Sequence, residues 1–348
     1  MFMYKSQPYY VKSNNVHNQR RVSTMIYYLF PRASLQINAH CKPLLVSEPS
    51  AHGYSHSLKH YLSGLKKNVR KDPRWDAICK KSHLYNELQT VSNLDMPFVC
   101  FEIIELYFLM HFSWENFTKI NSIHLGNPYT LRVLKYLRKN NPSDTFQVFD
   151  DNYTLNRFMT LARSKVDIAF CDASQGKTEY ENAVHLILQL SIVFCSQKKK
   201  GICLVKYEDS FSKLSLDVFA LLSHFYEKTY FVKPSVCLPT SGEKYLVCKG
   251  FVYDNIGEKM YQTLFHLYKT VLECPSDKHI DRILRSNIPL FLWGKLEEIN
   301  SIFGQPRLEQ MQQLLVMSEN PEWEYECTDM TKCQEWCVKH KLENYVIS

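Results

Sequence analysis

Three polar residues stand at or beside the ends of buried, strand-like segments in this chain of 348 residues. Asp172 ends VDIAFCD, Lys206 ends GICLVK, and Glu243 stands just ahead of the apolar run YLVC. In open α/β sheets, ligands and catalytic groups gather at the carboxyl ends of the strands. We therefore expect the three side chains to converge on one edge of a sheet, where two carboxylates would flank an amine.

The segments between these residues have the composition of crossover helices, which parallel strands require. Residues 183–194 (AVHLILQLSIVF) and 214–227 (LSLDVFALLSHFYE) are long and apolar enough to cover a sheet. Upstream, NSIHLG and TFQVFDDN are predicted strands, and TLRVLKYLRK between them is a predicted helix. This alternation predicts an α/β fold with helices on both faces of the sheet.

Taken together, these phrases resemble the carboxyl half of the FtsJ/RrmJ-type RNA 2'-O-methyltransferases, a family that includes the cap ribose methyltransferases. The resemblance runs from roughly Asn121 to Phe251. Its three polar residues match the last three members of the family's Lys-Asp-Lys-Glu tetrad. Lys233-Pro234 and Ser241 match the pattern that flanks the tetrad's Glu.

The resemblance implies a Rossmann-like methyltransferase that uses S-adenosylmethionine to modify a ribose 2'-oxygen of RNA, at or near the mRNA 5' cap. Asp172, Lys206 and Glu243 would be the catalytic residues. The ribose 2'-OH is a poor nucleophile, and the family's proposed mechanism uses the second Lys to help deprotonate it. Capped mRNA would be the substrate, and a capping or replication protein would be a partner.

The cofactor site implied by the resemblance lies after the first predicted strand. In the family a Gly-rich turn there approaches the methionine part of S-adenosylmethionine, because glycine lets the backbone come close. The turn in this chain reads LGNPYT, so Gly126, Asn127 and Pro128 would contact the cofactor, with fewer glycines than the family has. Asp150 would accept hydrogen bonds from the ribose hydroxyls. The alternative is that Asp150 and Asp151 cap the loop.

The first Lys of the tetrad has no counterpart. In the family it lies on a helix ahead of the first strand, in a pattern of the kind aromatic-Lys-x-x-Glu-Ile. Here Phe98, Glu102 and Ile103 fit that pattern, but Val99 occupies the place of the Lys. No Lys or Arg occurs anywhere from residue 82 to 118, so a shift of register within the helix does not restore it; Lys119 stays open as an alternative, close to the first predicted strand.

This replacement leaves two functions open. A solvated Lys has a pKa of about 10.4; a nearby cation lowers that value, and carboxylates raise it. With Val99 in place of a cation, we expect Lys206 to remain an ammonium ion. The chain is then either an active ribose methyltransferase or a non-catalytic pseudo-methyltransferase that binds RNA or supports an active capping partner. In the second case Asp172, Lys206 and Glu243 form an ion-pair network that holds the strand ends together.

Charge is concentrated at the N-terminal end. Residues 1–81 carry 14 Lys/Arg and 3 Asp/Glu, a net charge of +11 (14 − 3), whereas the whole chain carries +7. Such asymmetry indicates a polyanionic partner, and aromatic residues among the basic ones would stack on bases. The alternative is a solvated basic helix face. The predicted RNA-binding residues are Lys66, Lys67, Arg70, Lys71 and Arg74.

The chain divides into four predicted parts. We expect a basic, loosely ordered arm (1–50), a basic helical extension (51–94), the methyltransferase domain (95–255) and a helical extension (256–348). In the last part, separate helices are predicted at 260–273, 291–303 and 306–319 by apolar spacing. The tail places Cys333, Cys337 and His340 on one helix face, but their spacing matches no standard zinc pattern, so no metal is predicted.

The 12 cysteines include no CxxC pair, and the N-terminus lacks the apolar core of a signal peptide. Free thiols indicate a reducing compartment, so we expect the cytoplasm, or the host cytoplasm for a viral protein; the nucleus remains open. No uncharged apolar stretch is long enough to cross a bilayer, so a membrane is not an expected partner.

Overall fold

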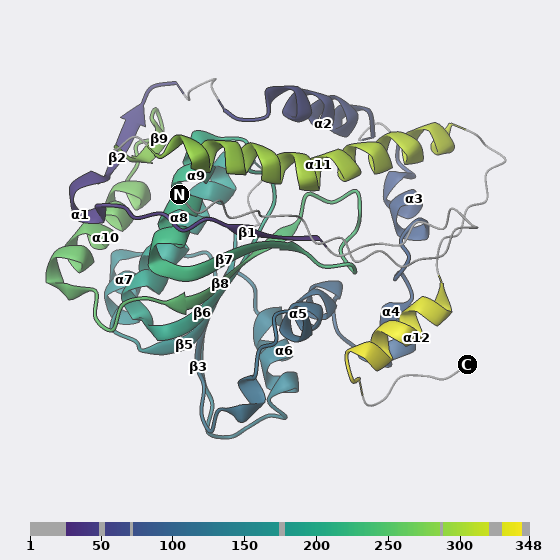
Figure 1. The fold of residues 1–348 in the computed structure, drawn as a ribbon, viewed down its shortest axis with the longest axis horizontal. Coiled ribbons are helices and arrows are strands. Elements are labelled where there is room, and N and C mark those ends of the chain that lie inside the picture. The colour runs from purple at the N-terminus through teal and green to yellow at the C-terminus, as the bar shows by residue number, and fades with distance from the viewer. Residues whose placement is uncertain are drawn as a thin grey trace, which may run out of the picture.

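The fold is a mixed seven-stranded sheet with helices on both faces (Figure 1), which confirms the Rossmann-like α/β prediction. The strand order is β1-β7-β8-β6-β5-β3-β4, and a separate pair, β2-β9, lies beside it. This computed structural model describes residues 26–48, 53–69, 72–173, 178–285, 288–319 and 329–342.

The four strands at the centre and one edge are parallel. They are β3 (Asn121–Leu125), β4 (Thr145–Phe149), β5 (Val166–Asp172) and β6 (Gln197–Tyr207). β3, β5 and the second half of β6 are short apolar runs, as expected for strands buried on both faces, whereas β4 at the edge of the sheet is partly exposed. Their carboxyl ends therefore share one edge of the sheet.

The strand beside β6 reverses the direction of the sheet. β8 (Lys244–Phe251) lies between β6 and β7 (Tyr226–Lys233) and is antiparallel to both. Because β7 consequently runs parallel to β6, the end of β7 and the start of β8 lie at the same edge as the end of β6. This arrangement brings Glu243, just ahead of β8, to the edge where Lys206 lies.

One face of the sheet is covered by α7 (Leu155–Leu161), α8 (Glu179–Ser196), α9 (Lys213–Phe225) and α10 (Gly257–Leu272) (Figure 1). α8 and α9 are the two crossover helices predicted from the sequence. α8 begins with a capping box in which the Thr178 hydroxyl accepts from the Glu181 N–H and the Glu181 carboxylate accepts from the Thr178 N–H. This cap fixes where the chain leaves the loop after β5.

The other face is covered by α5 (Phe98–Leu109) and α6 (Tyr129–Leu137). A buried ion pair fixes the loops below them: Arg138 Nη2 lies 2.8 Å from Asp144 Oδ1. Arg138 also donates to the carbonyl oxygens of Trp114 and Phe117, and Asp144 accepts from the N–H of Ile120. The short helix η1 (Trp114–Asn116) is held in this way against the start of β3.

The N-terminal region differs from the expected loosely ordered arm. Residues 1–25, 49 and 50 lie outside the described residues, but residues 26–48 form β1 (Ile26–Phe30), α1 (Ile37–His40) and β2 (Cys41–Val46). β1 pairs antiparallel with β7, and β2 pairs with β9 (His279–Leu284). Tyr28 and Phe30 alternate inward and are buried, a period-two signal too short to stand out in the sequence.

The helical extensions differ from expectation in two places. Within the extension predicted to be helical at 51–94, the residues from Trp75 onward form two short helices, α3 (Trp75–Lys81) and α4 (Leu88–Ser92), because turn hydrogen bonds around His83 interrupt them. Conversely, residues predicted as two helices form the single helix α11 (Leu290–Ser318), which continues through Pro306.

Tertiary contacts explain why α11 continues. Arg307, the residue after that proline, is buried and binds Asp209, which offsets the hydrogen bond that proline cannot make. The remaining helices, α2 (His56–Val69) and α12 (Met330–Lys339), lie where helices were expected. None of the helices in the described ranges has the length and apolar character needed to span a bilayer.

Replacing Arg138 by Met should lower the free energy of unfolding by about 3–5 kcal/mol, because it strands the buried Asp144 carboxylate without its cation. Urea denaturation followed by circular dichroism measures this. The matched control is Arg132→Met on the same helix, where the ion pair with Asp95 is exposed and should contribute about 0–1 kcal/mol. Equal losses in the two variants would contradict the role of the buried pair.

Candidate active site

The three predicted catalytic residues lie together at the carboxyl edge of the sheet. Asp172 and Lys206 are neighbours in the β5–β6 register. The Nζ atom of Lys206 lies 2.9 Å from Oε1 of Glu243. The topology of the sheet is sufficient to bring the three residues together, because each of them lies at or next to the end of a strand. Their catalytic role stays a prediction.

Glu102 is a fourth member of this cluster that was not predicted as a site residue. It lies on α5 and is 4% exposed, and its Oε2 atom lies 3.5 Å from Lys206 Nζ. The Tyr245 hydroxyl donates a hydrogen bond to it. Tyr245 is the partner of Lys206 in the β6–β8 register, so both side chains point to the face covered by α5. In the sequence, the one indication that Glu102 belongs to a site was that an acidic residue stands within a strongly apolar helix.

Carboxylates dominate the electrostatics around Lys206. Burial by itself would lower the pKa of Lys206, but the charges of Glu102, Glu243 and Asp172 outweigh it and raise the pKa above its ordinary value. Burial raises the pKa of Glu102, and Lys206 acts in the opposite direction. Lys206 is therefore an ammonium ion at neutral pH, as the sequence suggested.

Val99 lies one helical turn before Glu102 on α5 and is half-buried. Residues three positions apart on a helix are neighbours on the same face, so Val99 borders the cluster. One turn later, Glu105 accepts hydrogen bonds from the N–H groups of Ser235 and Val236, which fixes the loop after β7. The helix thus adds carboxylates to this edge of the sheet and no cation.

A second amine lies at the same edge. Lys233, the last residue of β7, donates through Nζ to the carbonyl oxygen of Ser241 at 2.5 Å. The Ser241 hydroxyl in turn accepts from the N–H of Glu243 at 3.0 Å. Burial lowers the pKa of Lys233 to about 8. In the sequence, Lys233 matched only a flanking pattern, although its place at the end of a predicted strand indicated that it would lie at this edge.

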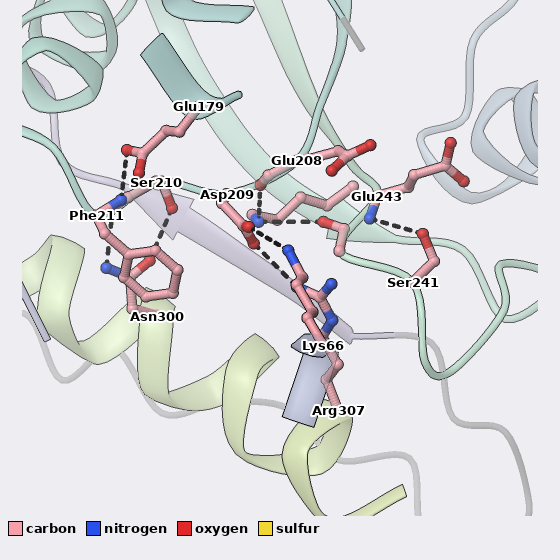
Figure 2. A network of polar contacts seen from close by, with 12 residues as sticks. Lys66, Glu179, Glu208, Asp209, Ser210, Phe211, Ser241, Glu243, Asn300 and Arg307 are labelled. Atoms are coloured by element: carbon pink, nitrogen blue, oxygen red, sulfur yellow. Dashed lines mark hydrogen bonds and ion pairs between the residues drawn. The ribbon is translucent and has the colours of Figure 1, made fainter. Parts of the chain in front are cut away.

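Cations from two outer helices meet beside the cluster, at Asp209 (Figure 2). Lys66 Nζ lies 2.8 Å from Asp209 Oδ2, and Arg307 Nη1 lies 2.9 Å from Oδ1. Burial would raise the pKa of Asp209, but Arg307 and Lys66 hold it well below its usual range. Lys244 donates to the carbonyl oxygen of Glu208, and burial lowers the pKa of Lys244 to about 7. Lys66, which was predicted to bind RNA, therefore lies beside the cluster and is paired with Asp209.

The other predicted RNA-binding residues lie apart from this cluster. Lys67 is exposed on α2, and Arg74 is paired with Asp72 next to α3. Arg70 and Lys71 lie outside the described residues. RNA binding by these residues stays a prediction.

The run of three lysines at 198–200 lies at the amino end of β6, the edge opposite the site. Each of its amines is paired with an acidic residue: Asp167, Asp254 and Glu227 respectively.

The predicted cofactor residues surround the turn after β3. Gly126 has φ +89°, and a β-carbon there would lie 2.4 Å from the carbonyl oxygen of Asp172, so only glycine fits. Asn127 Nδ2 donates to Asp172 Oδ2 at 2.9 Å, and Pro128 precedes α6. Asp150 follows β4 directly and is paired with Arg157 at the surface.

Gln189 of α8 lies against this turn, on the side that faces the core. Its Nε2 atom donates to the Asp172 carbonyl oxygen at 3.0 Å and to the Tyr153 hydroxyl at 2.9 Å. Its Oε1 atom is buried and accepts no hydrogen bond from the described residues. An unsatisfied buried acceptor is costly, which makes this oxygen an exception among the buried polar atoms that the structure describes.

Residues 113–251 match the family model of the FtsJ-like methyltransferases. The family resemblance is confirmed. The matched segment holds three of the four cluster residues, whereas Val99 and Glu102 lie just ahead of it on α5. S-adenosylmethionine-dependent methyltransferase is therefore the class that this segment supports.

Two solved structures are similar to the chain. Human methyltransferase-like protein 13 in complex with SAH shares 12% identity, over 51% of this chain and 90% of that one, with a TM-score of 0.28. The Methanococcus jannaschii fibrillarin pre-rRNA processing protein shares 13% identity, over 39% of this chain and 68% of that one, with a TM-score of 0.23. No curated protein matches the chain.

Glu102→Gln should lower the pKa of Lys206, because it removes one of three negative charges while keeping an oxygen that accepts from Tyr245. NMR titration of the lysine Cε–H groups, with Lys206→Met to assign the signal, measures this. Glu105→Gln on the same helix is the control and should leave the Lys206 pKa unchanged. A pKa unaffected by Glu102→Gln would show that Glu102 is already uncharged.

Proposed function

We propose that this protein transfers a methyl group from S-adenosylmethionine to a ribose 2'-oxygen of RNA, at or near the mRNA 5' cap. The observation that carries this proposal is the meeting of Asp172, Lys206 and Glu243 at the carboxyl edge of an FtsJ-like sheet. An amine held between carboxylates suits a hydroxyl substrate, because it can donate to the oxygen and, once deprotonated, accept its proton.

In this proposal Lys206 orients the ribose hydroxyl, while Glu243 and Asp172 hold the amine in place. The neutral amine is a minor form because the surrounding carboxylates raise its pKa. The rate of transfer should therefore be small at neutral pH and rise as the pH increases toward the pKa of Lys206.

The methyl donor would be held by the turn at Gly126, Asn127 and Pro128, and Asp150 would bind its ribose hydroxyls. Gln189 supports this turn through its hydrogen bond to the Asp172 carbonyl oxygen. When bound, S-adenosylmethionine would supply the methyl group. The basic N-terminal region would hold the RNA, and a capping or replication protein would be a partner in a reducing cytoplasm.

A second function is favoured by one observation: the amine at the centre of the site is surrounded by three carboxylates. The same cluster, left without a base, is a stable ion-pair network. The chain would then be a pseudo-methyltransferase that binds RNA or supports an active capping enzyme. Methyl transfer distinguishes the two functions.

The first test is transfer of labelled methyl from S-adenosylmethionine to capped RNA. We expect transfer to a ribose 2'-oxygen, abolished by Lys206→Ala. The matched control is Lys199→Ala at the amino end of the same strand, where the lysine is paired with Asp254 in solvent; it should retain full activity. RNA binding without transfer by the unaltered protein would support the non-catalytic function.

The second test restores the missing cation. Val99→Lys should lower the pKa of Lys206 and raise transfer at neutral pH, by about tenfold for each unit by which the pKa falls. Val99→Met provides similar length without charge and should not change the pH profile. If Val99→Lys shifts neither the profile nor the rate, Lys206 is not the base.

A further inference from the structure

A basic groove lies between β2 and α10, on elements that carry none of the residues of the candidate active site. Its volume is about 390 Å³. Lys42 of β2, Lys259 and His266 of α10, and Arg285 just after β9 line it, and its described lining includes no carboxylate. Figure 1 shows β2, α1 and α10 together on the left of the molecule, far from α12 on the right.

The three cations in this groove are free to bind a ligand. The side chains of Lys42, Lys259 and Arg285 are exposed and make no ion pair or hydrogen bond with the residues that the structure describes. This contrasts with the lysines at 198–200 and with Lys66, each of which is paired with an acidic residue. Because no described carboxylate forms an ion pair with these three side chains, their positive charge is available to an anion.

Neutral polar groups complete the lining. Asn38 and Gln262 supply amides, and Thr263 supplies a hydroxyl that donates to Asn38 Oδ1 at 3.3 Å. The guanidinium of Arg285 offers the planar pair of donors that phosphate oxygens accept, and the lysines supply point charges. The cations supply the chemistry of a phosphate site, whereas the Gln262 amide is already hydrogen-bonded to the Glu258 carboxylate on the same helix.

The position of the groove favours a polymer over a small anion. Arg285 follows the carboxyl end of β9, and Ile280 and Asp281 near its other end line a second cavity of about 360 Å³. That cavity has mixed charge: Lys59 is exposed there, Lys66 is paired with Asp209, and Glu179 and Asp281 also line it. Four to five residues of extended chain separate the two, a distance of about 13–17 Å. A ligand long enough to occupy both would lie along β9.

We propose that the groove formed by Lys42, Lys259 and Arg285 binds the phosphates of a single-stranded segment of RNA, at a second contact remote from the candidate active site. That the polyanion is RNA rests on the proposed function; the capture of phosphate does not. The groove would hold the part of the transcript that extends beyond the nucleotide at the candidate active site. It would therefore contribute to affinity for long RNA without taking part in methyl transfer.

The test is fluorescence anisotropy of the full chain with a labelled single-stranded RNA, measured over a range of salt concentrations. In the variant Lys42→Gln/Lys259→Gln/Arg285→Gln we expect weaker binding, and the slope of log affinity against log salt should fall by about 2. The matched control, Lys119→Gln/Lys165→Gln/Lys228→Gln, removes the same charge from exposed lysines near the amino ends of β3, β5 and β7 and should bind as the unaltered chain does.

Two results would overturn the proposal. Equal loss of affinity in both triple variants would show that only net charge matters. Competition by inorganic phosphate at concentrations far below those that displace RNA from the groove variant would show a small-anion site instead. Binding is measured whether or not the chain transfers methyl groups, so failure of the proposed function leaves this test intact. If transfer occurs, the groove variant should raise KM for long RNA and leave kcat unchanged.

Discussion

A buried ammonium ion at the edge of the sheet constrains the rest of the structure. Lys206 is held in a largely desolvated place, where an isolated charge would be too costly to keep. The fold compensates it from three directions: Asp172 on the adjacent strand, Glu243 ahead of β8, and Glu102 on the helix above. Each of these elements must be in place for the charge to be tolerated. The cluster therefore specifies the packing of α5 on the sheet as much as it provides a reactive group.

The reversed strand makes this arrangement possible. A wholly parallel sheet would send Glu243 to the opposite edge, since it precedes its strand. Because β8 is antiparallel to both neighbours, its start joins the ends of β6 and β7, and the second amine, Lys233, arrives there too. The grouping of these side chains at one edge thus depends on the antiparallel pairing of β8 with β6 and with β7.

The sequence predicted what local patterns determine. Apolar runs that end in polar residues gave the parallel strands, their crossovers and the meeting of Asp172, Lys206 and Glu243. It did not predict β1 or the continuity of α11 through Pro306, because distant partners, β7 and Asp209, stabilise them. The contact between Glu102 and Lys206 was missed for the same reason: a helix pattern shows that a residue is buried but does not show what it faces.

The pairing of β1 with β7 also affects the order in which the molecule can assemble. Ile26 lies opposite Lys233 in the register, so about 200 residues are synthesised before β1 has a partner. During that interval the first strand must stay unpaired while the parallel strands form around later segments. Contacts this distant in sequence close slowly, so the edge of the sheet would be completed last. A nascent chain released before β7 would have no partner for its first strand.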